Sequence, residues 1–296
     1  MIRAIILDVD GVIVGEKIGY NSPYPNEEVI KRLKAIKDKG IAVSLCTAKP
    51  YWAVSKIISD AGLHNLHITE GGAVIIDPLD DKILKTHVIN AEEAAKVVNT
   101  YLEANAYTEI YTLDDYYIQK SQQNELTHKH EHILQRKPKI VDSLVKQISQ
   151  TQIVKIMPVA KNEQDKDRLT QLFKPFEDHL TLSWGVHRVA LPHQFGIITA
   201  KGISKQLAAL EIATYERVSM EELLGVGDSA SDWQFIKHCG YAATMANGAP
   251  ELKKLITNKG SNSYIGGHVD ENGVLAIFDY FEGRMHYRTD IGHRPV

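Results

Sequence analysis

Cysteine is scarce in this sequence, since Cys46 and Cys239 are the only two among 296 residues. Each lies in an apolar run, so we expect both to be reduced and buried, and a fold held together by several disulfides is excluded. Long hydrophobic runs are also missing, because no stretch approaches the roughly 20 apolar residues that a membrane-spanning helix needs. The apolar run Ile2–Leu7 is too short, and too soon followed by acidic residues, for a signal peptide. We therefore expect a cytoplasmic protein without a membrane partner.

An excess of charge of one sign is absent as well. The 34 Lys and Arg residues nearly balance the 37 Asp and Glu residues, and the net charge is -3. This balance gives no electrostatic reason to expect nucleic acid as a general partner. Hydrophobic residues make up 44% and charged residues 24% of the chain, without internal repeats or low-complexity segments. These properties are typical of a globular protein large enough for one large domain or two ordinary ones.

Short apolar runs alternate with helical segments in both end portions of the chain. Ile2–Leu7, Ile41–Cys46 and Leu223–Gly227 are typical of strands that are buried on both faces. A helix between the first two has Asn26 as its N-cap and ends at Gly40. This alternation predicts an α/β fold with a doubly wound parallel sheet and right-handed crossovers.

The pattern changes in the middle of the chain. Segments such as Tyr107–Thr112 and Ile153–Val159 alternate apolar and polar residues, as half-buried antiparallel strands do. The doubly wound pattern then returns, with a helix expected to begin near Thr199. We predict a core interrupted by one inserted α+β cap domain, with these boundaries: 1–84 and 193–296 for the core, 85–192 for the cap.

Acidic and hydroxyl side chains follow the predicted core strands at the points where these end. Asp8 and Asp10 follow the first strand, Thr47 follows the second, and Asp228 follows a later one, with Asp232 four residues further on. In open parallel sheets, ligands bind at this edge. Two carboxylates as close as those of Asp8 and Asp10 repel each other unless a cation lies between them. Mg²⁺ suits such an all-oxygen site, together with water and a substrate phosphate.

Each of these features also has an ordinary structural explanation. The two pairs of aspartates can form a turn and cap a helix, and Thr47 can be a plain loop residue. Lys201, which opens the expected helix beside a glycine, can be a solvated surface lysine. The functional interpretation therefore depends on the order and spacing of all four elements together.

The core segments contain these elements in the following order: DVDG at 8–11, Thr47, Lys201 and GDSASD at 227–232. In this order they resemble the haloacid dehalogenase (HAD) superfamily of phosphohydrolases. Four further segments make the chain similar to the Cof-type branch, subfamily IIB: 68–73, 199–202, 245–251 and 270–274. The resemblance covers nearly all of the two core segments and is loose across the cap.

The resemblance implies a role for each catalytic residue. Asp8 would attack phosphorus and form an aspartyl-phosphate. Asp10 would protonate the leaving oxygen and then activate the hydrolytic water. Thr47 would hydrogen-bond the phosphoryl group, and Lys201 would offset its charge.

The resemblance also implies a metal site. Asp8, the backbone carbonyl of Asp10, and Asp228 would hold Mg²⁺, and Asp232 would support the metal shell or the lysine. The chain departs from the branch in three places, which are Ser231 in place of the usual Asn, Thr47-Ala48-Lys49 in place of Thr-Gly-Arg, and Glu70-Gly71-Gly72 in place of Glu-Asn-Gly. None of these changes removes a catalytic group.

Two groups of cap residues have open interpretations. One group contacts the substrate, or else packs on the sheet and faces solvent: Trp184, His187 and Arg188. The run His128-Lys129-His130-Glu131-His132 is either a solvated segment or a zinc or nickel site.

The expected function is therefore a Mg²⁺-dependent phosphatase for small phosphorylated metabolites, with sugar phosphates as the expected class. A phosphomutase of the same superfamily and a catalytically silent regulatory protein are the alternatives. Phosphate release from an aryl phosphate distinguishes an enzyme from a silent protein, and release rather than isomerisation distinguishes a phosphatase from a mutase. The sequence does not identify the substrate, the cap residues that contact it, the role of Ser231 or the oligomeric state.

Overall fold

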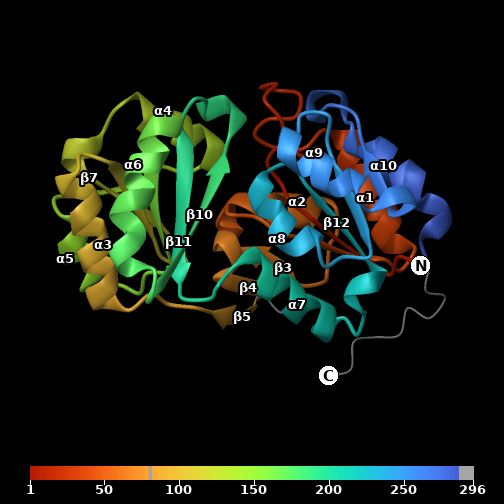
Figure 1. The fold of residues 1–296 in the computed structure, drawn as a ribbon, viewed down its shortest axis with the longest axis horizontal. Helices are drawn as coiled ribbons and strands as arrows, with labels where there is room; N and C mark the ends of the chain where they lie inside the picture. The colour runs from red at the N-terminus through yellow and green to blue at the C-terminus, as the bar shows by residue number, and fades with distance from the viewer. Residues whose placement is uncertain (80–81, 287–296) are drawn as a thin grey trace.

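A computed structural model describes residues 1–79 and 82–286 of the chain. Figure 1 shows two lobes side by side, a core that contains both ends of the described chain and a cap built from its middle. The last ten residues of the predicted core domain, 287–296, lie outside the described residues. No helix in the described part of the chain is both long and apolar enough to cross a membrane.

Five parallel strands form the core sheet, in the order β14-β13-β12-β1-β2. Their bounds are Ala4–Leu7 (β1), Ala42–Leu45 (β2), Leu223–Gly227 (β12), Tyr241–Thr244 (β13) and Ser263–Ile265 (β14). Strand β1 is apolar throughout because both of its faces are buried. Ile5 and Leu7 belong to one apolar cluster, whereas Ala4 and Ile6 belong to another.

Helices cover both faces of the core sheet (Figure 1). Three share the cluster of Ile5 and Leu7: α1 (Glu27–Asp38), α2 (Tyr51–Asp60) and α10 (Val274–Phe281). Three share the other cluster: α7 (Lys205–Tyr215), α8 (Trp233–Ile236) and α9 (Pro250–Thr257). The predicted cap of α1 is present, since the Asn26 side chain accepts the Glu28 N–H. The predicted doubly wound α/β fold is confirmed.

A small antiparallel sheet extends the core beyond β2. It contains β3 (His67–Thr69), β4 (Val74–Asp77) and β5 (Lys82–Thr86). Its link to the core sheet is a parallel bridge between Cys46 and Ile68. Both cysteines, Cys46 and Cys239, are buried and unbonded to each other, as the apolar context of each predicts.

Six strands form the cap sheet, in the order β10-β11-β9-β6-β7-β8. Their bounds are Tyr107–Tyr111 (β6), Tyr116–Gln119 (β7), Lys139–Val141 (β8), Lys155–Ala160 (β9), Leu180–Val186 (β10) and Gln194–Ala200 (β11). Three helices pack on one face: α3 (Ala91–Glu103), α5 (Leu144–Ile148) and α6 (Glu163–Phe173). Helix α4 (Glu125–Leu134) packs on the other face. Strands β6 and β9 are therefore buried at every residue, rather than half-buried as predicted.

The return from the cap to the core differs from the prediction. Strand β11 continues to Ala200 because it is paired with β10 along its whole length, with Ala200 opposite Leu180. Gly202 then turns the chain with a φ of +78°, a value that favours glycine. Ser204 caps the next helix by accepting the Leu207 N–H. The helix expected near Thr199 thus begins at Lys205, and this correction changes which lysine reaches the core sheet edge.

Candidate active site

The carboxyl ends of the core strands bring acidic side chains together. Asp8 follows β1, and its N–H continues the strand pairing by donating to the Val226 carbonyl at 2.9 Å. The turn after it depends on Gly11, which has a φ of +76°. A Cβ atom at Gly11 would lie 1.9 Å from Asp228 Oδ2, so any other residue would displace that carboxylate. The glycine of the DVDG motif therefore makes room for Asp228 beside Asp8.

Three carboxylates form a compact cluster. Oxygen atoms of Asp8, Asp228 and Asp232 all lie within 4.8 Å of one another. The ammonium group of Lys205 lies 2.7 Å from Asp8 Oδ2 and 2.8 Å from Asp232 Oδ1. One cation thus binds two of the three acids. Among the described residues, no cationic side chain forms a hydrogen bond or ion pair with the carboxylate of Asp228.

Burial and mutual repulsion shift the acidities of these groups. Burial, followed by the charge of Asp232, raises the pKa of Asp8 to about 7 despite its contact with Lys205. The pKa of Asp228 is raised well above its ordinary value by burial and by the charges of Asp232 and Asp8. Burial opposes ionisation of Asp232 too, but Lys205 and the Ser229 hydrogen bonds hold its pKa below the ordinary value. A further cation between Asp8 and Asp228 would restore both to the charged form.

The donor set fits a divalent metal ion at Asp8 and Asp228. Both oxygens of Asp232 are already used, since Oδ1 accepts from Lys205 and Oδ2 accepts from Ser229 Oγ at 2.8 Å and from the N–H groups of Ser229 and Asp228. Asp8 accepts one hydrogen bond on each oxygen, from the Val9 N–H and from Lys205, whereas Asp232 accepts four in all. Asp232 is therefore the member of the cluster that supports the other two. Carboxylates from different loops, with room for water, are the ligands that Mg²⁺ takes in phosphate-binding sites.

The side chain of Asp10, predicted to act as acid and base, contacts two cationic side chains. Its Oδ1 lies 2.7 Å from Lys49 Nζ and 3.2 Å from His187 Nε2. Burial works against ionisation of Asp10, yet Lys49 and His187 keep its pKa well below the usual range. These contacts occupy the Asp10 side chain, and the predicted metal ligand from this residue is its backbone carbonyl. Sequence reasoning noted Lys49 only as a departure from a motif, although it contacts a catalytic candidate.

Thr47 lies at the edge of the sheet where the sequence places it. It is buried, its N–H donates to the Ile68 carbonyl, and its hydroxyl oxygen accepts the Lys49 N–H at 3.1 Å. A hydroxyl that accepts one hydrogen bond still has its own proton to donate. Thr47 lines the same pocket as Asp8, so this proton is available to a ligand oxygen there.

Lys201 does not reach this cluster, and its predicted place there needs correction. Its side chain is exposed, and its ammonium group donates to the Glu177 carbonyl within the cap. Lys205 lies with the aspartates instead, because the strand before it is longer than expected and Ser204 starts the helix. The sequence does contain a pattern that indicates the correct lysine. Ser204 is a typical N-cap residue, and Lys205 follows it as the first residue of the helix.

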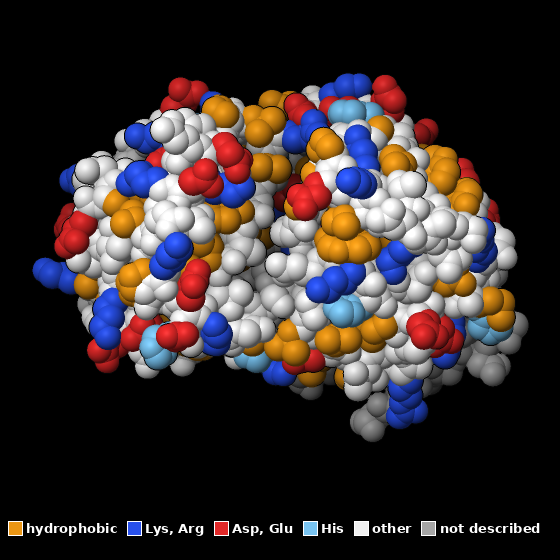
Figure 2. Space-filling view, in the orientation of Figure 1, with side chains coloured by type: hydrophobic (Ala, Val, Ile, Leu, Met, Phe, Trp, Pro, Cys, Tyr) orange, Lys and Arg blue, Asp and Glu red, His pale blue; other side chains and the backbone are white. Residues whose placement is uncertain are grey.

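Cap residues close the pocket over the core sheet edge. Figure 2 shows the surface hollowed along the boundary between the two lobes. Of the three cap residues considered from the sequence, His187 lines the pocket next to Asp10. Trp184 instead donates to Thr170 Oγ1 at 3.0 Å, on the side of the cap helices. His128 is exposed, whereas His130 is buried and lies 2.8 Å from Glu109, so these two histidines have separate surroundings.

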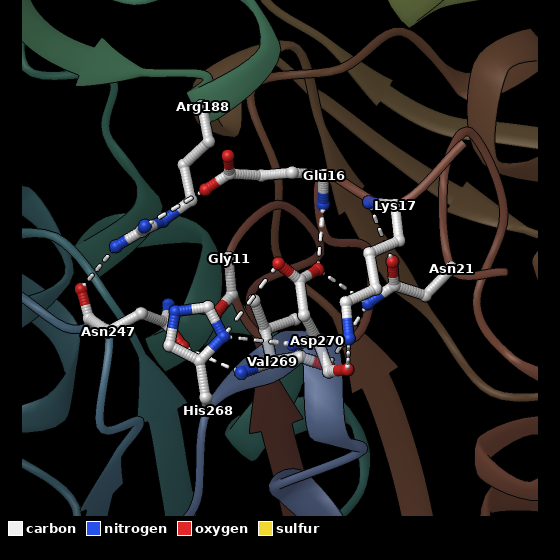
Figure 3. Close-up of polar contacts among 9 residues, drawn as sticks. All are labelled: Gly11, Glu16, Lys17, Asn21, Arg188, Asn247, His268, Val269 and Asp270. Carbon is white, nitrogen blue, oxygen red and sulfur yellow. Dashed lines mark hydrogen bonds and ion pairs between the residues drawn. The ribbon is translucent and has the colours of Figure 1, made fainter.

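Arg188 ties the cap to the loop that carries Asp10 (Figure 3). Its guanidinium donates to Glu16 Oε1 at 3.0 Å and to the Asn247 carbonyl at 2.6 Å. The Asn247 side chain in turn donates to the Gly11 carbonyl at 2.8 Å. Asp270 fixes the far part of the same loop by accepting the Glu16 N–H at 2.9 Å. Contact between the cap and this loop thus places His187, the neighbour of Arg188, beside Asp10.

A second tie between cap and core is buried. Lys155, on β9 of the cap, lies 2.5 Å from Glu70 and donates to the Ala48 carbonyl at 2.8 Å. Both charged side chains are almost fully buried, with exposed fractions of 1% and 2%. The centroid of the Tyr111 ring lies 3.7 Å from the Lys155 ammonium nitrogen. Because Ala48 separates Thr47 from Lys49, this tie holds the cap against the loop that faces the predicted phosphate position.

Comparisons with known proteins agree with this geometry. The family model of haloacid dehalogenase-like hydrolases matches residues 5–278. The chain belongs to the haloacid dehalogenase-like hydrolase family. A phosphatase of Bacillus subtilis, YwpJ, is 23% identical in an alignment of 270 positions that covers 86% of this chain and 92% of YwpJ. A phosphoglycolate phosphatase of Staphylothermus marinus is 24% identical in an alignment of 264 positions that covers 88% of this chain and 93% of the relative.

Solved structures of HAD proteins have the same fold. SMU.1108c from Streptococcus mutans superposes with a TM-score of 0.79 at 19% identity, over 96% of this chain and 100% of the other. The subclass IIB sugar phosphatase BT4131 superposes with a TM-score of 0.76 at 20% identity, over 95% of this chain and 99% of the other. The prediction of a HAD phosphatase of the Cof-type branch is confirmed.

The carboxylate cluster predicts that a divalent cation stabilises the protein. At a concentration 100 times the dissociation constant, Mg²⁺ should raise the free energy of unfolding by about 2.7 kcal/mol. For a chain of this size the melting temperature should rise by about 5 °C, measured by calorimetry. Without metal, the melting temperature of Asp228→Asn should be no lower than that of the wild type, because one repelling charge is gone. On addition of Mg²⁺, the variant should lose most of the increase in melting temperature that the wild type gains. The exposed Asp167→Asn on α6 is the control, and an equal rise in Asp228→Asn would exclude the site.

Proposed function

We propose that this protein hydrolyses phosphate monoesters of small metabolites, with Mg²⁺ held by Asp8, Asp228 and the Asp10 carbonyl. The observation that carries the proposal is the position of Asp8, with one oxygen on Lys205 and the carboxylate of Asp228 alongside. The metal would neutralise charge on the phosphoryl group and orient it for attack. Localisation of the protein in the cytoplasm is part of the same proposal.

Asp8 acts as the nucleophile in this mechanism. A carboxylate oxygen attacks phosphorus, the bond from phosphorus to the leaving oxygen breaks, and an aspartyl-phosphate forms. Thr47 donates its hydroxyl proton to a phosphoryl oxygen. Lys205 offsets the charge of that group, in the role that the family resemblance implies for Lys201.

Asp10 transfers protons to the leaving oxygen and from the attacking water. Lys49 and His187 keep it ionised in the structure described. A phosphoryl group that enters beside them competes for both cations, which raises the pKa of Asp10 toward that of a proton donor. In the second step, water attacks phosphorus, Asp10 accepts the proton, and inorganic phosphate leaves with Asp8 restored.

The predicted cap, residues 85–192, together with strand β11 of the same sheet, which extends to Ala200, selects the substrate. The core contributes groups for a phosphoryl moiety, whereas the wall of the pocket beyond it comes from the cap. Arg188 and Lys155 hold the cap against two different core loops. Closure of this kind excludes water and completes the site around a small molecule.

The covalent mechanism is tested by Asp8→Asn. The amide keeps the size of the side chain but removes its nucleophilic charge, so phosphate release from an aryl phosphate should fall below detection while the melting temperature stays within a few degrees. Free phosphate, rather than an isomerised ester, is the product to measure, because it distinguishes a phosphatase from a mutase. Substantial turnover by the variant would contradict Asp8 as the nucleophile.

The lysine assignment is tested by a matched pair of variants. Lys205→Ala should lower kcat by about 10²–10³, because a preorganised charge at the transferred group is lost. Lys201→Ala removes an exposed lysine four residues away and should leave kcat within twofold. Circular dichroism checks that both variants are folded. The reverse result, a large loss only in Lys201→Ala, would reject the assignment of Lys205.

The cap contact is tested by Arg188→Gln. Losing a charge-assisted hydrogen bond of about 1.5 kcal/mol should lower the closed population and reduce kcat/KM about tenfold, chiefly through KM. Arg168→Gln, on the outer helix α6, is the control, since Arg168 contacts only groups of the cap in the described structure. Equal kinetic constants for Arg188→Gln and the wild type would exclude closure through Arg188.

A further inference from the structure

Alternation along the cap strands decides which side chains meet the substrate. In β10, Leu180, Leu182 and Trp184 pack toward the cap helices. The residues between them, Thr181, Ser183 and Gly185, line the pocket. The partner strand β11 follows the same rule, with Ile197 opposite Ser183 and Phe195 opposite Gly185, both at the pocket.

Apolar side chains dominate this part of the pocket. They come from β9, β10, β11 and α4, and all but one are buried in the structure: Ile133, Leu134, Met157, Val186, Phe195 and Ile197. Gly185 stands opposite Phe195 in the strand pair, so no side chain of β10 covers that position. A Cβ atom at Gly185 would lie 3.5 Å from Ile197 Cδ1, at ordinary contact distance, and its φ is not in the left-handed region. Free space beside Phe195 and Ile197 thus depends on the missing side chain of Gly185.

Most polar groups of the same wall already have partners. Tyr111 donates to Glu109, and His130 lies 2.8 Å from Glu109. Lys155 is held by Glu70, and the Thr181 hydroxyl accepts the Gly202 N–H. These groups face one another or the core loops, so they offer few hydrogen bonds to a ligand.

Two polar atoms of the cap wall, in the part of the chain that the structure describes, have no such partner. The hydroxyl of Ser183 makes no hydrogen bond to the protein. His187 Nδ1 is buried without a partner, whereas its Nε2 lies near Asp10. The Thr181 hydroxyl, which accepts one hydrogen bond, also keeps its own proton to donate. The wall can therefore recognise a few polar substituents on a ligand.

From this lining we infer that the group esterified to the phosphate is a flat apolar ring with a few polar substituents, rather than a polyhydroxy chain. This inference rests on the proposed phosphatase function. A sugar brings several hydroxyl groups, and hydroxyls buried against Phe195, Ile197 and Met157 would lose water without replacement. A ring of aromatic size loses no such hydrogen bonds and gains from the removal of apolar surface from water. The expected class is the phosphate ester of an alcohol that carries an aromatic or heteroaromatic ring.

The inference is tested with matched primary alkyl esters in the presence of Mg²⁺. Benzyl phosphate and glucose 6-phosphate both carry the phosphate on a CH₂ group, so their intrinsic reactivities are similar, and methyl phosphate reports the phosphate end of the site alone. The ratio kcat/KM should favour benzyl phosphate over glucose 6-phosphate by at least tenfold. A preference for glucose 6-phosphate would overturn the inference while leaving the proposed phosphatase intact. Phosphate release from none of the esters would contradict the phosphatase and the inference together.

Gly185→Val provides the matching test on the protein. Its side chain would occupy the space beside Phe195 and Ile197, so the ratio of kcat/KM for benzyl phosphate to kcat/KM for methyl phosphate should fall at least tenfold. Trp184→Phe, the adjacent residue on the opposite face, is the control. Phe195→Leu keeps the apolar volume but removes the ring, and should lower the preference for benzyl phosphate about threefold or more. An unchanged preference in both pocket variants would overturn the inference.

Discussion

The contact of one ammonium group with two carboxylates holds the site together. Lys205 meets Asp8 and Asp232, which come from different strand ends, and it lies on a helix that begins only after the cap strand is complete. Without this cation, the charges of three acids within 4.8 Å would repel one another or be neutralised by protons. Asp228 stays outside the pairing, with its pKa raised, so one acid is left for the proposed metal ion. Lys205 thus orders Asp8, the proposed nucleophile, and Asp232, while the proposed metal ion would complete the charge balance.

The cap adds a second layer of constraint, which acts on the loops rather than on the reacting atoms. The Lys155–Glu70 pair is buried, so separating its charges by opening that region would leave an unpaired charge out of water. The Arg188 contacts are partly exposed and involve a surface carboxylate and a backbone carbonyl, so they break at lower cost. This difference favours motion that opens the pocket at Arg188 and pivots near Lys155. The position of His187 beside Asp10 then depends on closure, which links cap position to the acid and base chemistry.

The two ends of the pocket have opposite character. Charged and hydroxyl groups surround the predicted phosphate position, whereas strands β9 to β11 and helix α4 surround the leaving group with apolar side chains. Such a division lets the core perform the same phosphoryl transfer on different esters, while the cap residues decide which ester is bound. The sequence-based expectation of a sugar phosphate came from the family resemblance, and the lining of this particular cap is the reason to expect an apolar ring instead.

The sequence by itself determined the core fold and four of the site residues. Continuous apolar runs require strands buried on both faces, and the residues that follow such strands, Asp8, Asp10, Thr47 and Asp228, must lie at one sheet edge. Only the tertiary structure decided that Lys205 and not Lys201 reaches Asp8, because the end of β11 is fixed by its pairing with distant β10. Docking of the cap likewise decided that His187 lies beside Asp10, since their chain positions are far apart and no local pattern relates them. The contact of Lys49 with Asp10 depends on the packing of two loops within the core. The local pattern of apolar and polar residues determines the helices and strands and their ends. Contacts between the core and the cap depend on how the surfaces of the two folded lobes fit together.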